Sequence, residues 1–146
     1  MSRTGLAVVI AIVVLPLLAW AGSALTVRND SGSTIGRIES DGAVRNASGS
    51  AFGRIEASGT VRNGSGSTIG RVDADGTVRN ASGASMGRVE SDGTLRNSSG
   101  SSMGRLDGCT ARNASGSSIG SFEGCSSADL HVMAAYLYFF GAFHHD

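Results

Sequence analysis

The sequence is dominated by a unit of about seventeen residues that recurs six times between residues 26 and 125. The first copy has the pattern Thr-Val-Arg-Asn-x-Ser-Gly-Ser-x-Ile-Gly-Arg-Ile-Glu-x-Asp-Gly, and the spacing shortens by one residue before the last copy. A fixed period of this length is typical of repeat architectures, because one small unit cannot bury its apolar face alone. With 146 residues, the chain has room for one such domain.

Each unit predicts two short β-strands. In the second copy, a β-favouring run at residues 44–46 is followed by turn residues at 47–49, and a second extended run at 50–56 ends in another turn. Strand-like runs separated by glycine-containing loops of about three residues are typical of β-hairpins. Six copies therefore predict an all-β fold of about twelve short antiparallel strands.

The apolar residues predict how these strands pair. Centring one hairpin on Asp41 places Ile38 opposite Val44, and centring the next on Ser48 places Val44 opposite Phe52. Apolar partners across two strands are the unit of sheet stabilisation. In the shortened copy, Leu106 still lies opposite Ala111 if the loop contracts to residues 108–109.

One spacing within each repeat does not fit a regular strand. Ile35 and Ile38 are three residues apart, so strict alternation would point them to opposite faces. We therefore expect a bulge or bend at the intervening Gly36, which would return both side chains to one face. The expected core of the repeats is Val27, Ile35, Ile38, Val44, Phe52, Ile55, Val61, Ile69, Val72, Val78, Met86, Val89, Leu95, Met103, Leu106, Ile119 and Phe122.

A parallel β-solenoid is the alternative arrangement of the same repeats. It would stack equivalent arginines in one column, and like charges directly opposite each other are unfavourable. The antiparallel meander instead mixes these arginines with the carboxylates of the repeat, so we favour the meander. The arginines concerned are Arg37, Arg54, Arg71, Arg88 and Arg105.

The C-terminal segment, residues 126–146, supplies the large side chains that the repeats lack. Eight strands already enclose about as much space as their own side chains fill, so twelve strands need further material inside. A helix over residues 130–143 would be apolar all round, which indicates burial on every side, and Ser126 with Asp129 resembles a capping box. We expect a closed β-flower or barrel around this helix; the alternative is that residues 136–143 form one more strand. Expected helix core residues are Leu130, Met133, Leu137, Phe139 and Phe140.

The first 25 residues have the features of a secretory signal peptide. A basic residue at Arg3 precedes an aliphatic run at 6–18, and small residues near 19–24 suit cleavage at 21–24. The alternative is an uncleaved membrane anchor, since the apolar stretch approaches the length of a spanning helix. In both cases the repeats would lie outside the cytoplasm.

The two cysteines agree with an oxidising compartment. Cys109 and Cys125 occupy equivalent positions in the last two repeats, sixteen residues apart. Such positions are good candidates for a disulfide, and the alternative is two free thiols.

The repeats and the tail together resemble the bacterial five-fold β-flower proteins. The resemblance rests on the Ile-Gly-Arg-Ile and Asp-Gly-Thr-Val-Arg blocks and on the Tyr- and Phe-rich run at residues 134–140, and it covers residues 26–143. It implies a pseudo-symmetric all-β arrangement of hairpins in an extracytoplasmic protein, and the family implies no catalytic residues. A looser architectural likeness is to tubby-type barrels, in which a hydrophobic helix threads twelve strands.

Other patterns point to turns rather than to chemistry. Each repeat contains Asn-x-Ser, the N-glycosylation acceptor, but the Asn is better suited to capping a turn. The acidic turns match no calcium-loop spacing, and the terminal His144 and His145 lack a third fixed ligand. We predict no metal site, no cofactor and no enzymatic activity.

These observations predict a non-catalytic protein of the cell envelope, secreted, periplasmic or attached, with a structural or interaction role. The chain has 12 basic and 12 acidic residues, which argues against a nucleic-acid partner. Envelope proteins or glycans are the expected partners. The alternative function is lipid interaction through the aromatic tail, which is too short to span a bilayer but long enough for interfacial attachment.

Overall fold

The structure, a computed structural model, describes residues 24–143. The predicted signal peptide at residues 1–25 lies almost wholly outside this range, as do the terminal residues 144–146. The described residues form β-strands followed by a short 3-10 turn and a helix. The strands are β1 (Leu25–Asn29), β2 (Thr34–Ile38), β3 (Ala43–Asn46), β4 (Ala51–Ile55), β5 (Thr60–Asn63), β6 (Thr68–Val72), β7 (Thr77–Asn80), β8 (Ser85–Val89), β9 (Thr94–Asn97), β10 (Ser102–Asp107), β11 (Thr110–Asn113) and β12 (Ser118–Glu123).

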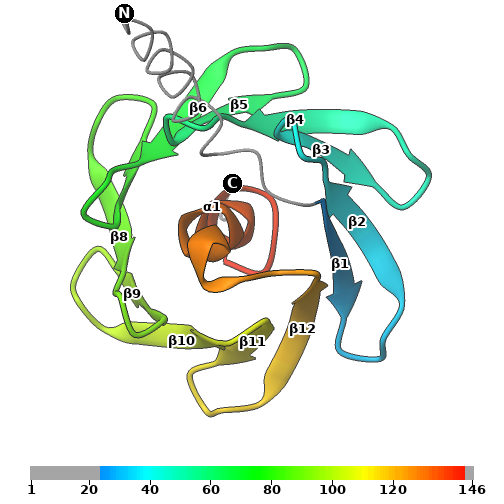
Figure 1. Ribbon diagram of the computed structural model, residues 1–146. Helices are drawn as coiled ribbons and strands as arrows, with labels where there is room; N and C mark the ends of the chain where they lie inside the picture. Colours follow the sequence, from blue (N-terminus) through cyan, green and yellow to red (C-terminus); the bar gives the residue numbers. More distant parts are fainter. Residues whose placement is uncertain (1–23, 144–146) are drawn as a thin grey trace, which may run out of the picture.

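The strands close into one antiparallel barrel, which confirms the fold predicted from the repeat. Each strand pairs with its neighbours in the chain, and β1 pairs with β12 to complete the ring, with Val27 opposite Phe122. Viewed along the barrel, the hairpins form a ring around a central helix (Figure 1). Since all pairs are antiparallel, the solenoid alternative is excluded.

Two kinds of turn occupy opposite ends of the barrel. The Asn turns join the two strands of each hairpin, as at residues 29–33, and the linking turns join successive hairpins, as at residues 39–42. Each linking turn also binds the following hairpin: the Ile55 N–H donates to the Gly42 carbonyl at 2.8 Å. Gly42 has φ +96°, and a Cβ there would collide with the Ile55 carbonyl oxygen, so this turn requires glycine.

The register confirms the predicted pairs across the linking turns. Ile38 lies opposite Val44, and Leu106 lies opposite Ala111 across the contracted loop at residues 108–109. The predicted pair of Val44 with Phe52 is wrong, since Val44 lies opposite Gly53. A bulge in β4 leaves Phe52, the residue before this glycine, without a cross-strand partner.

The same bulge recurs in every hairpin, at the position that the spacing predicted, but it does not bury both apolar residues. Ile38 is buried, whereas Ile35 is 42% exposed, so its assignment to the core is wrong. The physical reason is that the bulge takes Ile35 out of the alternation while Gly36 turns inward. The equivalent residues of the other hairpins are half-buried and pack against the core; they are Phe52, Ile69, Met86, Met103 and Ile119.

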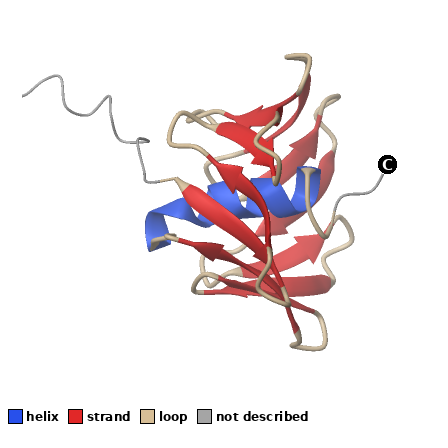
Figure 2. Cartoon of the chain, turned by 90° about the vertical axis from the view of Figure 1, so that its right-hand side faces the viewer, coloured by secondary structure: helices blue, strands red, loops and turns tan. Residues whose placement is uncertain are grey.

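The C-terminal segment is helical and lies inside the barrel. Ser126 caps a 3-10 turn, η2 (Ser127–Asp129), which leads into α1 (Leu130–Phe139). The predicted capping box is present, because Asp129 accepts from the Ser126 backbone N–H at 2.8 Å and the Ser126 hydroxyl accepts from the Ala128 N–H. Figure 2 shows the helix running along the barrel between its walls. The alternative of a further strand at residues 136–143 is excluded, although the helix ends at Phe139 rather than Phe143.

The helix side chains form the centre of the core. Residues 132–139 are all buried, while Leu130 and Phe140 are half-buried and pack against the same cluster. Leu25, Ala43 and Ala111 are also buried, although the repeat pattern did not mark them as core. The wall residues with no exposed surface are Val44, Val61, Val78 and Leu95, and Leu25, Ile38, Ile55 and Phe122 are also fully buried.

Each hairpin has one inward-facing glycine, which we call its core glycine, and at five of these six positions a side chain of the C-terminal segment approaches the wall. The core glycines are Gly36, Gly53, Gly70, Gly87, Gly104 and Gly120. At Gly70, an added Cβ would lie 2.5 Å from the Phe139 ring, and at Gly53 it would lie 2.5 Å from the Phe140 ring. A glycine at these positions therefore makes room for an aromatic ring of the tail.

Tyr138 shows that polar atoms inside the barrel are also satisfied. Its hydroxyl donates to the Arg96 carbonyl on β9 and lies 3.3 Å from the Arg88 carbonyl on β8. Burial raises the pKa of Tyr138 to about 12.

Across residues 24–143, the structure contains no helix of the length and apolarity that crossing a membrane would require.

Candidate functional site

The outer wall is the most regular polar surface of the molecule, and one arginine of each hairpin holds its Asn turn. Arg79 illustrates the arrangement: its Nη1 donates to the Gly83 carbonyl at 3.0 Å, and its Nε lies 2.8 Å from Oδ2 of Asp73, which follows the neighbouring strand β6. The equivalent arginines make the same bond to their own turns, so their role is structural. They are Arg28, Arg45, Arg62, Arg96 and Arg112.

The carboxylates at the strand ends separate arginines that face each other. Arg71 and Arg79 are direct cross-strand partners, so the meander also brings like charges together, contrary to the argument used against the solenoid. Asp73 relieves this repulsion because it accepts from both guanidinium groups, at 2.7 and 2.8 Å. The hydrogen bonds from Arg79 and Arg71 hold the pKa of Asp73 below its usual value.

An ion pair also joins the two ends of the repeat array. Arg28 on β1 lies 2.9 Å from Glu123 on β12, across the seam where the ring closes. The hydrogen bond between them lowers the pKa of Glu123 and raises that of Arg28. Because both groups are exposed to solvent, the ion pair adds little to the stability of the fold, and its main effect is on the register of β1 against β12.

A second set of arginines is exposed on the outer wall; we call it the arginine row. It contains one residue from each of five hairpins, Arg37, Arg54, Arg71, Arg88 and Arg105, and Ser121 occupies the sixth position. Arg37 and Arg71 pair with carboxylates. Within residues 24–143, no ion pair shorter than 4.0 Å joins Arg54, Arg88 or Arg105 to a carboxylate.

The Asn-x-Ser sequences have a structural explanation. In the second hairpin, Oδ1 of Asn46 accepts from the backbone N–H groups of Ser48 and Ser50 at 3.1 and 3.0 Å, and from the Ser48 hydroxyl. The same three bonds recur in the hairpins of Asn29, Asn63, Asn80, Asn97 and Asn113. Each Asn side chain therefore builds its turn, as the sequence suggested.

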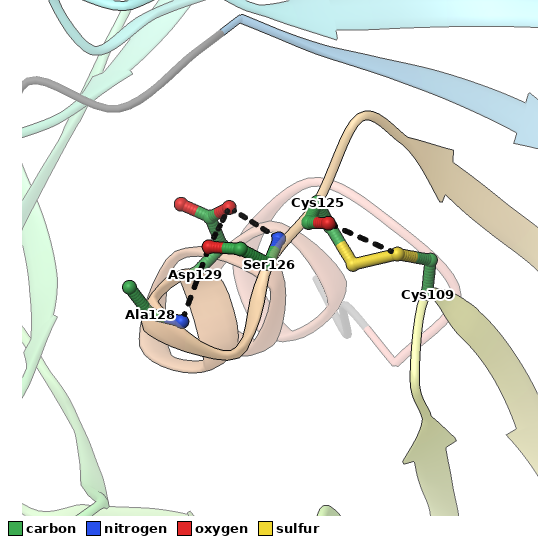
Figure 3. Close-up of a disulfide and its surroundings, with 5 residues drawn as sticks. All are labelled: Cys109, Cys125, Ser126, Ala128 and Asp129. Atoms are coloured by element: carbon green, nitrogen blue, oxygen red, sulfur yellow. Dashed lines mark hydrogen bonds between the residues drawn. A yellow bond between two sulfur atoms is a disulfide. The ribbon is translucent and has the colours of Figure 1, made fainter.

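The linking-turn end of the barrel contains the disulfide. Cys109, in the turn between β10 and β11, is bonded to Cys125, which follows β12 and precedes the helix cap, with their Cα atoms 5.8 Å apart (Figure 3). The bond thus ties the barrel wall to the segment that enters the barrel. It joins the two cysteines that the sequence placed in equivalent positions.

Replacing both cysteines by serine should lower the free energy of unfolding by about 3 kcal/mol, because the bond closes a loop of sixteen residues in the unfolded chain. Urea unfolding of the oxidised protein, the reduced protein and the double variant measures the effect. The reduced protein and the variant should agree. A midpoint that does not move in either would show that the bond contributes nothing to stability.

A cleft of about 500 Å³ lies at this same end, between the start of the helix and the β4–β6 part of the wall. Its floor is apolar, with Ile55, Val72 and Val132, and its rim includes Glu56 and the half-buried His131. Within residues 24–143, no hydrogen bond joins His131 to a serine, a cysteine or a carboxylate, and no three His, Cys, Asp or Glu side chains form a cluster that could hold a metal. The cleft thus offers shape but no assembled reactive group.

The acidic turn residues that could have suggested calcium are otherwise engaged. Oδ1 of Asp41, Asp75 and Asp92 each accepts the N–H two residues later, at 3.0 Å, and these bonds lower the pKa of Asp75 and Asp92. His144, His145 and Asp146 lie outside the described residues.

The burial of the tail bears on lipid attachment. An interfacial segment must present its apolar side chains to the bilayer, but residues 132–139 face the interior of the barrel. The structure therefore does not support the use of this segment as a lipid anchor.

These features define a class: a ring of short hairpin repeats, tied by a disulfide to its own C-terminal helix, which fills the interior. The family described as "5-fold beta-flower protein" matches residues 24–141, and the chain belongs to this family. The ring formed by residues 24–143 has six hairpins rather than five. No curated protein and no solved structure matched the chain.

Proposed function

We propose that the protein is an exported, non-catalytic component of the cell envelope that binds anionic partners through the arginine row. The observation that carries the proposal is the repetition of exposed guanidinium groups around the wall, three of them without an ion pair among the described residues. A guanidinium group binds carboxylates, phosphates and sulfates with two parallel hydrogen bonds. Anionic envelope glycans therefore suit this surface best.

The use of the other recurring polar groups supports this proposal. The Asn side chains build turns, the second arginine of each repeat binds its Asn turn, and the strand-end carboxylates bridge arginines. In the arginine row, Arg54 donates to the Asp41 carbonyl at 2.9 Å, and within residues 24–143 the guanidinium groups of Arg88 and Arg105 make neither an ion pair nor a hydrogen bond. A partner with evenly spaced negative charges would contact several equivalent positions at once, which raises its effective affinity.

Export is supported by two features of the chain. The first 25 residues have the pattern of a signal peptide, and disulfides persist mainly in oxidising compartments. A periplasmic, secreted or envelope-attached protein fits both. Labelling of the cysteines in fractionated cells tests this part: the protein should be outside the cytoplasm, with both cysteines blocked until reductant is added.

Binding is tested with the chain from residue 24 onward, which retains all of β1, and immobilised anionic and neutral polysaccharides of the cell envelope. The double variant Arg88→Gln/Arg105→Gln should bind the anionic polymer about tenfold more weakly, which corresponds to about 1.4 kcal/mol. The matched control is Arg37→Gln/Arg71→Gln, which removes the same charge from groups already paired with carboxylates and should weaken binding less. Equal binding to neutral polymers, or equal loss in both variants, would contradict the proposal.

A further inference from the structure

The core glycines are matched to groups of the tail in five of the six hairpins. An added Cβ would lie within 3.4 Å of a tail aromatic residue at each of these positions. The pairs are Gly36 with Tyr136, Gly53 with Phe140, Gly70 with Phe139, Gly87 with Tyr138 and Gly104 with Phe143. The tail therefore distributes its aromatic side chains around the ring, one to a hairpin.

The sixth hairpin differs. At Gly120, the closest atoms to an added Cβ belong to the backbone of β1, and none of the described aromatic rings comes within reach as it does elsewhere. The residue opposite Gly120 is Ala111. In the other hairpins, the residue opposite the core glycine is larger, namely Val27, Val44, Val61, Val78 or Leu95.

A pocket of about 250 Å³ lies beside Gly120 and Ala111, the two positions at which the sixth hairpin differs. Its lining includes Ala111, Gly120, Phe122, Tyr136 and Phe140. The exposed Ile35 also lines it, so it is reached from solvent. An apolar cavity of about 150 Å³ in another protein binds benzene, so this volume accommodates a substituted single ring.

We propose that this pocket binds a small molecule with one aromatic ring. Rings of Phe122, Tyr136 and Phe140 line it, with Phe122 edge-on to Tyr136 at a centroid distance of 5.7 Å. Aromatic pairs prefer such edge-to-face and offset arrangements, which favours a planar ring over an aliphatic one. The bound ring would lie beside Gly120, as the aromatic residues of the tail lie beside the other core glycines. This site is separate from the arginine row and does not depend on its function.

The probe is phenol, titrated into the ¹⁵N-labelled oxidised protein and followed by NMR. Resonances of Ala111, Gly120 and Phe122 should shift together, with a dissociation constant of about 1 mM or tighter, as expected for a very small ligand. Cyclohexanol, which has the same size but no aromatic ring, should bind several-fold more weakly. Shifts spread over the molecule, or equal binding of the two probes, would contradict the proposal.

The test variant is Ala111→Leu, which introduces the residue found at the same position in β9. The matched control is Ala43→Thr: Ala43 lies away from the pocket, and threonine is the residue of the sister repeats at this position. Ala111→Leu should weaken phenol binding at least tenfold, and Ala43→Thr should leave it unchanged. Should Ala111→Leu not fold, Ala111→Val uses the residue of four other hairpins. Undiminished binding by a folded Ala111 variant would overturn the assignment.

Discussion

A chain that ends at Asp129 should fail to form the barrel. The eight buried residues of the helix, 132–139, are the centre of the core. Burial of a large apolar side chain contributes about 1.5–3 kcal/mol, so their loss removes on the order of 10 kcal/mol. A domain of this size has a total stability of about 5–15 kcal/mol, which leaves nothing to hold the ring closed.

Circular dichroism in the near ultraviolet and amide dispersion by NMR measure the outcome. The control is a chain that ends at Phe143, which retains every described residue and should fold like the full chain. A dispersed spectrum from the chain ending at Asp129 would show that the hairpins support one another without the helix.

The substitution Gly70→Ala should destabilise the protein by about 3 kcal/mol and lower its melting temperature by about 10 °C. The added Cβ would lie 2.5 Å from the Phe139 ring and would also collide with the Arg79 backbone carbonyl. Phe139 is buried, so neither the ring nor the strand can move without disturbing the core. This single methyl group therefore tests the contact between wall and helix.

The matched control is Gly66→Ala in an Asn turn. Gly66 has φ +90° but nothing within 4 Å of an added Cβ, so alanine there adds backbone strain of about 1–2 kcal/mol and no collision. Thermal and urea unfolding of both variants give the comparison. If Gly70→Ala cost no more than Gly66→Ala, the close approach of Phe139 to the wall would be refuted.

The parts of the fold that could be predicted from the sequence depend on local rules. The pairs across the linking turns, such as Ile38 with Val44, follow from loop length and strand alternation. The shortened loop at residues 108–109 preserves its apolar pair for the same reason. The helix cap at Ser126 and Asp129 follows from side-chain chemistry within four residues.

The parts that could not be predicted depend on contacts between distant segments. The bulge was expected at the glycine, but its register was not: it leaves Phe52 unpaired and puts Gly53, whose added Cβ would meet the Phe140 ring, opposite Val44. The helix is apolar on every side, so no amphipathic pattern indicates which face meets which hairpin. The pairing of each aromatic residue with a core glycine therefore requires the three-dimensional structure.

The candidate sites divide in the same way. The cysteine pair was visible as equivalent positions in adjacent repeats, and the arginines were visible as a repeated residue. The sequence did not show which arginines bind turns, as Arg79 does, and which form the exposed arginine row. That division depends on which guanidinium group reaches a carbonyl of its own turn. The pocket beside Gly120 likewise arises from Ala111, whose small size matters only because no described ring fills the space.

The most direct test is a nuclear Overhauser measurement on the ¹³C-labelled, oxidised protein. Cross-peaks should link the ring protons of Phe139 to the α-protons of Gly70, and those of Phe140 to the α-protons of Gly53. Ring protons of these residues with random-coil shifts and contacts only to water, in a molecule whose strands are ordered, would contradict the view that the tail fills the barrel.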